Sequence, residues 1–184
     1  MSRRMTKSPG RFSLPQAALA VLVLLSVCLA AASVGRAAGV LQLSAEQESY
    51  SLAGYADIME DPSAMLTIDQ VASPNMACRF TALTTDSNSL GFTNSNYWLR
   101  VSVAPDPAAP KVRWFLDPGW IYYSRLVFYA PGQNGDDRFV AHNRGLSAHD
   151  LKTQTRYFPL NTGAAATYYL LLGSDRMLNL EPKI

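Results

Sequence analysis

The sequence predicts an all-β fold, either an antiparallel β-sandwich or a jelly roll. Short segments rich in β-branched and aromatic residues recur at fairly regular spacing, and several of them alternate apolar with polar side chains. Little of the chain shows helical periodicity, which argues against a parallel α/β sheet. With 184 residues, the chain is long enough for one self-standing core plus a leader.

The strongest strand signal is the stretch Tyr97–Val103, in which the side chains alternate with a period of two. The alternation separates an apolar face from a mixed face: Tyr97, Leu99, Val101 and Val103 on the first, and Trp98, Arg100 and Ser102 on the second. Gly91–Asn96, just before it, is rich in turn-forming residues. We therefore expect a turn that leads into a strand buried on its apolar face.

Two further strands are predicted nearer the N-terminus. Val40–Leu43 is short and apolar, and Tyr50–Asp61 shows partial alternation at Ala56, Ile58 and Glu60. The Asp-Pro-Ser sequence that follows ends the second of these strands.

The segment between these strands and Tyr97 is predicted to hold a helical turn and an irregular stretch. Thr67–Val71 fits a single helical turn with Thr67 as its N-cap. Ser73–Asn88 is polar and is expected to be irregular, with Phe80 and Leu83 directed inward.

The C-terminal half alternates predicted strands with turns rich in proline, glycine and asparagine. In Lys111–Leu116 the residues Val112, Trp114 and Leu116 share one face, and Ser124–Ala130 is apolar on both faces, which indicates a central strand. The remaining predicted strands are Arg138–His142, Arg156–Leu160, Thr167–Leu172 and Met177–Leu180. The predicted turns and loops are Ala104–Pro110, Asp117–Gly119, Pro131–Asp137 and Asn143–Thr155.

The charge distribution gives no reason to expect a nucleic-acid-binding surface. The formal net charge is +2, but five of the 16 basic residues lie before Ala38, where there are no acidic residues. The remaining 11 basic residues face 14 acidic ones, so the body carries a net charge of −3. A mildly acidic body has no basic footprint for phosphate.

Residues 1–37 have the features of a signal peptide or an uncleaved membrane anchor. Met1–Arg11 is basic and polar, Ala17–Val34 is apolar, and Gly35 and Ala37 fill the small positions of a cleavage site after Ala37. The apolar segment approaches the length that spans a bilayer, and its basic start keeps the N-terminus cytoplasmic. Either alternative exports residues 38–184, which we expect to be periplasmic.

No motif in the sequence indicates catalysis, a metal site or a cofactor. His142 and His149 have no zinc-site spacing, Asp136 and Asp137 are too few for a calcium loop, and no Gly-x-Ser-x-Gly elbow is present. Cys78 is the body's lone cysteine and is expected to be buried and inert. We therefore expect a protein that is not an enzyme.

Aromatic residues near strand ends are the best candidates for ligand contact. Trp98 and Arg100 share one strand face, where a planar cation beside an aromatic ring suits stacking. Trp120 and Tyr122 follow a turn, where side chains are often presented at a rim. The alternative is structural: Trp98 is covered by another sheet, Arg100 forms a salt bridge, and the rings pack in the core.

The sequence GFTNSNYWLRVSV at Gly91–Val103 resembles the signature of the extracellular sensor domains of bacterial 7TM-DISM (diverse intracellular signalling module) receptors, type two. In that family a Gly-Phe pair precedes a polar run and then Tyr-Trp-Leu-Arg. The similarity extends over Leu43–Leu180. The other matching segments are Asp57–Pro62, Leu66-Thr67, Trp114, Leu126–Tyr129, Phe158–Leu160 and Tyr168–Leu172.

The resemblance implies a jelly roll similar to carbohydrate-binding modules and a periplasmic sensory role in signal transduction. The family supplies no catalytic residues, and its sensor domain normally precedes seven membrane helices and a kinase, cyclase or phosphatase module. This chain has no second apolar span before Ile184, so we expect residues 38–184 to be a sensor domain truncated at its C-terminal end. Membrane association then comes from the N-terminal segment or from a missing C-terminal region.

We expect the partner to be a small polar ligand such as a carbohydrate, contacted by Trp98, Arg100, Trp120 and Tyr122. The first alternative is an envelope module for protein–protein interaction or homodimerisation without a small ligand. A secreted hydrolase is the second alternative and the third function considered. A concave face with convergent polar groups favours the first of these functions, and a flat apolar surface favours the second.

Overall fold

The computed structural model describes residues 38–85, 88–107, 112–119, 123–132, 138–143, 157–161 and 163–184. The predicted signal or anchor segment, residues 1–37, lies outside the described residues. No helix within the described part of the chain is both long and apolar enough to cross a membrane.

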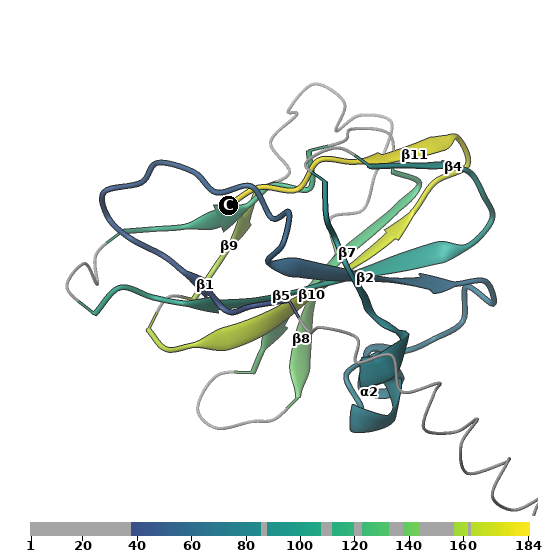
Figure 1. The fold of residues 1–184 in the computed structure, drawn as a ribbon. Helices are drawn as coiled ribbons and strands as arrows, with labels where there is room; N and C mark the ends of the chain where they lie inside the picture. The colour runs from purple at the N-terminus through teal and green to yellow at the C-terminus, as the bar shows by residue number, and fades with distance from the viewer. Residues whose placement is uncertain are drawn as a thin grey trace, which may run out of the picture. The chain divides into compact units, whose positions relative to one another are not determined.

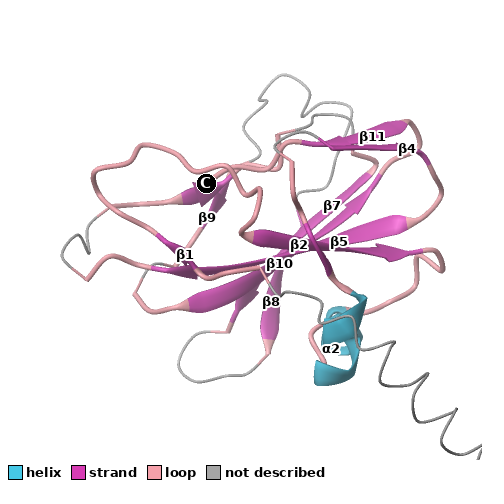
Figure 2. Cartoon of the chain, in the orientation of Figure 1, coloured by secondary structure: helices cyan, strands magenta, loops and turns pink. Residues whose placement is uncertain are grey.

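Strands dominate the described residues, and most of them form one seven-stranded sheet (Figure 2). This main sheet runs in the order β3-β2-β5-β10-β7-β8, and its neighbours pair antiparallel; β1 adds to β5 in parallel. The strands are β1 (Leu41–Gln42), β2 (Ala56–Asp61), β3 (Thr81–Ala82), β5 (Asn96–Ala104), β7 (Arg125–Pro131), β8 (Phe139–Asn143) and β10 (Ala166–Gly173).

Two short antiparallel sheets pack against one face of the main sheet. One consists of β4 (Asn88–Phe92) and β11 (Met177–Leu180), and the other of β6 (Phe115–Leu116) and β9 (Phe158–Pro159). Figure 1 shows β4 and β11 on one side of the main sheet and α2 on the other. The result is the antiparallel sandwich that the sequence predicts.

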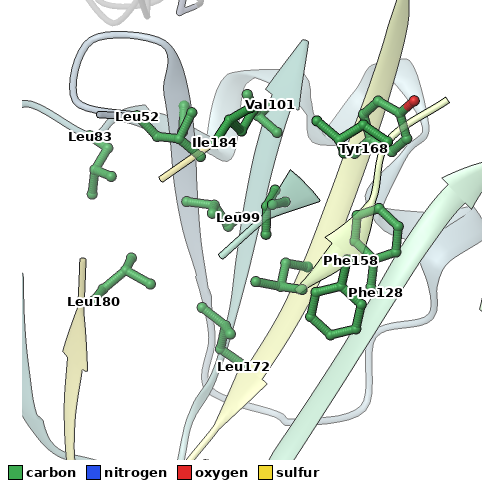
Figure 3. Packing of buried hydrophobic residues seen from close by; sticks show 14 of the residues in the cluster. Leu52, Leu83, Leu99, Val101, Phe128, Phe158, Tyr168, Leu172, Leu180 and Ile184 are labelled. Carbon is green, nitrogen blue, oxygen red and sulfur yellow. The ribbon is translucent and has the colours of Figure 1, made fainter. Parts of the chain in front are cut away.

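The sandwich core lies between these layers, and its composition follows the predicted strand register. On β5, the alternate residues from Tyr97 to Val103 face this core, while Trp98 faces the opposite side of the sheet. Leu99 pairs with Leu170 on β10, so the same alternation continues across the sheet. Figure 3 shows the aromatic centre of the core, where the ring centroids of Phe128 and Phe158 lie 4.8 Å apart.

The second face of the main sheet is covered by a helical segment. It consists of α2 (Ile68–Val71) and the 3-10 helix η1 (Pro74–Arg79). Thr67 is the N-cap of α2 as predicted, because its side chain accepts from the amide of Gln70 and the Gln70 side chain accepts from the amide of Thr67. Phe80 is directed inward, also as predicted, and it packs with Trp98 beneath this segment.

Two local expectations are wrong. The bend that leads into β5 lies at Thr93–Ser95, as expected, but Gly91 and Phe92 lie in β4 and not in this turn. Ser73–Asn88 contains η1 and β3 where an irregular stretch was expected. Gly91 has a φ of 74° at a register shift in which Leu178 pairs with Gly91 but Asn179 pairs with Ser89. A bulge and a turn both use the left-handed conformation that favours glycine, so composition alone does not separate them.

Among the described residues of the predicted strand Lys111–Leu116, only Phe115–Leu116 form a strand. The predicted alternation of its side chains is nevertheless confirmed, because Trp114 and Leu116 are buried while Phe115 is 40% exposed. The tip of the predicted loop Pro131–Asp137 and nearly all of Asn143–Thr155 lie outside the described residues.

Candidate functional site

Trp98, the first predicted contact residue, is fully buried on the outer face of the main sheet. It packs with Met59, Val71 and Phe80, and its ring centroid lies 5.6 Å from that of Tyr129. Its Nε1 has no hydrogen-bond partner among the described residues. This position matches the structural alternative for Trp98, with the α2–η1 segment as the cover in place of a second sheet.

Arg100 also follows the structural alternative. Its Nη2 lies 2.6 Å from Oδ2 of Asp57, which is directly opposite on β2, and Nε donates to the same oxygen at 3.2 Å. The guanidinium also stacks 4.2 Å from the ring centroid of Phe80. Asp57 in turn accepts from the amide of Ala38.

The other two predicted contact residues, Trp120 and Tyr122, lie outside the described residues. Their ligand contact stays a prediction. The structure therefore does not bring the four predicted residues together at one described site.

A different place in the fold is hollowed. An open hollow of about 550 Å³ lies at the edge of the sandwich where β2, β3 and β5 approach β4. Its lining combines apolar side chains with hydroxyl and charged groups: Ile58, Glu60, Pro62, Arg79, Thr81, Leu90 and Tyr97. We refer to it below as the edge hollow.

Strand pairing explains why these side chains meet. Glu60 lies opposite Tyr97, and Ile58 lies opposite Thr81, so all four project from the same face of the main sheet. Leu90 comes from the facing layer, where it is the extra residue in the β4 bulge. Bulges re-aim side chains in this way, and here the result is an apolar wall opposite a polar one.

Glu60 and Tyr97 form the inner polar part of the edge hollow. Burial raises the pKa of the Tyr97 hydroxyl, and the negative charge of Glu60 and a hydrogen bond to it raise the pKa further. The hydroxyl of Ser95 donates to Oε1 of Glu60 at 2.7 Å. Tyr97 is therefore neutral at pH 7, with its hydroxyl directed at a carboxylate.

Arg79 supplies the opposite charge at the end of η1. Its Nη2 donates to the main-chain carbonyl of Glu60 at 3.3 Å, which ties the 3-10 helix to the edge of β2. Thr81 stands beside it on β3, and its hydroxyl donates to the carbonyl of Ile58 at 3.2 Å. Both side chains are exposed at the rim.

The rim beside Pro62 is fixed by Asp61, which is buried at the end of β2. Burial by itself raises the pKa of this carboxyl, but hydrogen bonds from Ser63 and from the amides of Leu66, Ser63 and Ala64 lower it below the ordinary value of 3.8. The carbonyl of Ala64 accepts from Nδ2 of Asn96 at 3.2 Å, so the loop is also held by β5.

Sequence reasoning missed the edge hollow, although two signals for it are present. Glu60 continues the inward alternation of Ala56 and Ile58, which places a carboxylate where an apolar side chain is expected. Gly91 interrupts a strand, which is typical of a bulge. Neither signal shows that β4 lies beside β2, because that contact depends on the tertiary fold.

The chemistry available here is recognition by hydrogen bonds and charge. No group of three or more histidine, cysteine, aspartate or glutamate residues within the described ranges is arranged to hold a metal ion. Cys78 is a free thiol and is exposed, so the expectation that it is buried is wrong: it lies on η1, in which no residue is buried.

Comparison with known proteins gives one family assignment. The model of the family described as 7TMR-DISM extracellular 2 matches residues 53–184, which include every residue that lines the edge hollow. A search of curated proteins found no match.

Proposed function

This chain belongs to the 7TMR-DISM extracellular 2 family and is an extracellular sensor domain of a signalling receptor, and we propose that it senses a small polar ligand in the edge hollow. A carbohydrate is one candidate ligand. The family implies an exported location, and we propose the periplasm, reached through the N-terminal segment as a signal or anchor.

One observation carries the proposal: a carboxylate, a guanidinium and two hydroxyl groups line the same concave surface as three apolar residues. A largely preformed cavity with a few convergent polar groups is the usual form of a small-molecule site. We also propose that the domain binds without catalysis and needs no cofactor.

The test is a thermal-shift screen of the full chain against sugars and small polar metabolites. A ligand of the native state raises the melting temperature in proportion to the logarithm of its concentration. Tyr97→Phe keeps the ring and removes the hydroxyl directed at Glu60, so it should reduce the shift. Tyr157→Phe, at an exposed tyrosine outside the hollow, is the matched control. No shift with any compound would contradict the proposal.

A second candidate function is interaction with another protein or a second copy of this chain. Phe92 on β4 is 77% exposed, and its cross-strand partner Met177 on β11 is 41% exposed. Light scattering of the wild type and of Phe92→Ser would test this alternative. A dimer that dissociates in the variant would favour it.

A further inference from the structure

The edge hollow presents two opposite charges whose side chains are not paired with each other. Glu60 and Arg79 both line it, but their side chains form no salt bridge with each other, unlike those of Arg100 and Asp57. We propose that the ligand is a small zwitterion, such as an amino acid, with its ammonium group at Glu60 and its carboxylate at Arg79. This inference rests on the proposed function of the hollow.

The Glu60 carboxylate has acceptor capacity left for a cation. It accepts from the hydroxyl of Ser95, and an ionised carboxylate has about four lone-pair sites. This neutral donor holds the carboxylate in place without cancelling its charge. An ammonium group supplies three donors and a positive charge for the acceptor sites that Glu60 has left.

The Arg79 guanidinium likewise has donors left for an anion. Nη2 donates to the carbonyl of Glu60, and Nη1 contacts Sδ of Met76 at 3.9 Å, so these bonds hold its orientation. A guanidinium has five N–H donors in a fork that fits a carboxylate. Because both present partners are neutral, the positive charge of Arg79 stays available to a ligand.

The remaining lining favours a zwitterion with an apolar part over a neutral sugar. Ile58, Leu90 and Pro62 provide apolar surface between the charged groups. Tyr97 is the aromatic residue of this described lining, and it is 8% exposed, so its ring offers no open platform on which a sugar could stack. A neutral sugar would also leave both charges uncompensated.

The experiment is isothermal titration of the full chain with the common amino acids, followed by two derivatives of each amino acid that binds. N-acetylation removes the ligand's cation, and conversion to the amide removes its anion. We expect each derivative to bind at least about tenfold more weakly, because one charge-assisted hydrogen bond contributes this much or more.

Variants assign each charge to its partner. Glu60→Gln should weaken binding of the amino acid at least about tenfold. In this variant, N-acetylation of the ligand should weaken binding little further. Arg79→Gln should also weaken binding of the amino acid at least about tenfold, and in this variant conversion of the ligand to its amide should weaken binding little further. Glu48→Gln and Arg113→Gln, at exposed positions away from the hollow, are the matched controls, and unchanged melting temperatures show that the variants fold.

The outcomes separate the two proposals. If neutral sugars such as glucose bind and amino acids do not, and Tyr97→Phe weakens the sugar, the sensor function stands and the zwitterion is wrong. If amino acids bind equally well after N-acetylation or amide formation, the zwitterion is also wrong. If no amino acid, sugar or other small polar metabolite of the thermal-shift screen binds the folded chain, both proposals are wrong.

Discussion

Arg100 on β5 lies directly opposite Asp57 on β2, and the two side chains form an ion pair of 2.6 Å on the outer face of the main sheet. Their side chains are 18% and 5% exposed, and Phe80 stacks on the guanidinium. The pair is therefore largely removed from water. The charge of Arg100 is paired with a carboxylate of the domain, whereas the hydrogen-bond partners of Arg79 are neutral.

Breaking this pair should strongly destabilise the fold. Arg100→Ala leaves a nearly buried carboxylate without its counter-charge, so we expect a loss of about 3–5 kcal/mol in the free energy of unfolding. Urea denaturation followed by circular dichroism measures it, with Arg113→Ala as the exposed control. The double variant Arg100→Met, Asp57→Leu should lose less than the sum of the single variants; additive losses would contradict the buried-pair interpretation.

Alkaline pH should unfold the domain through its buried tyrosines. Burial raises the pKa of Tyr168 above the ordinary value of 10.0, so the unfolded chain releases this proton more readily than the folded one. The stabilisation is complete below pH 10 and is lost as pH rises toward the higher folded-state pKa. We expect the unfolding free energy to fall by up to about 1.4 kcal/mol per pH unit for each such hydroxyl.

Tyr168→Phe isolates one contribution to this pH dependence. The variant loses the hydrogen bond from the hydroxyl to the carbonyl of Asn161, which lowers stability at every pH below 10. Its decline at alkaline pH should nevertheless be shallower than that of the wild type. An equally steep decline would show that Tyr168 does not contribute.

Asp61 should give the opposite pH dependence. Its folded-state pKa lies below the value of 3.8 for the unfolded chain, so the folded state binds this proton less readily. The stabilisation is present above pH 3.8 and is lost as pH falls through the folded-state pKa. Asp61→Asn should cost about 1–3 kcal/mol at neutral pH, because fewer donors are accepted.

The measurement for Asp61 is the difference in unfolding free energy between wild type and Asp61→Asn across acidic pH. The difference should shrink below about pH 4 as the wild-type carboxyl takes up its proton. A difference that is constant with pH would show that the charge of Asp61 is not stabilising.

Two glycines with similar backbone conformations should differ in their tolerance of alanine. Gly91 and Gly119 have φ values of 74° and 82°, so alanine at either position should cost about 1 kcal/mol in backbone strain. A Cβ at Gly91 meets nothing within 4 Å, whereas at Gly119 it would lie 2.3 Å from the carbonyl oxygen of Glu181. Thermal unfolding should therefore show a clearly larger loss for Gly119→Ala, and equal losses would contradict the close approach.

The strand register could be predicted because it is a local property. Alternation in Tyr97–Val103 assigns each side chain to one of two faces, and the structure places Leu99 in the sandwich core and Trp98 on the other side of the sheet. The pattern does not say what covers the second face. That cover is the α2–η1 segment, whose position depends on tertiary packing of Val71 and Phe80.

The edge hollow could not be predicted for a related reason. Its lining extends from Ile58 to Tyr97 along the chain and includes Leu90, whose direction depends on the bulge at Gly91. A one-residue bulge reverses the face of every residue beyond it in the strand. Sequence patterns without the β4–β11 pairing therefore give no reliable direction for Leu90.

The edge hollow takes one wall from each layer, with Leu90 on β4 and Ile58 on β2. Within the described residues, β4 is hydrogen-bonded to β11 and not to the main sheet. The layers are joined by the short chain segments 93–95 and 174–176 and by an apolar contact, which has no preferred direction and therefore does not by itself fix their lateral position. A ligand that contacts both Leu90 and Ile58 would therefore restrict the movement of β4 relative to β2.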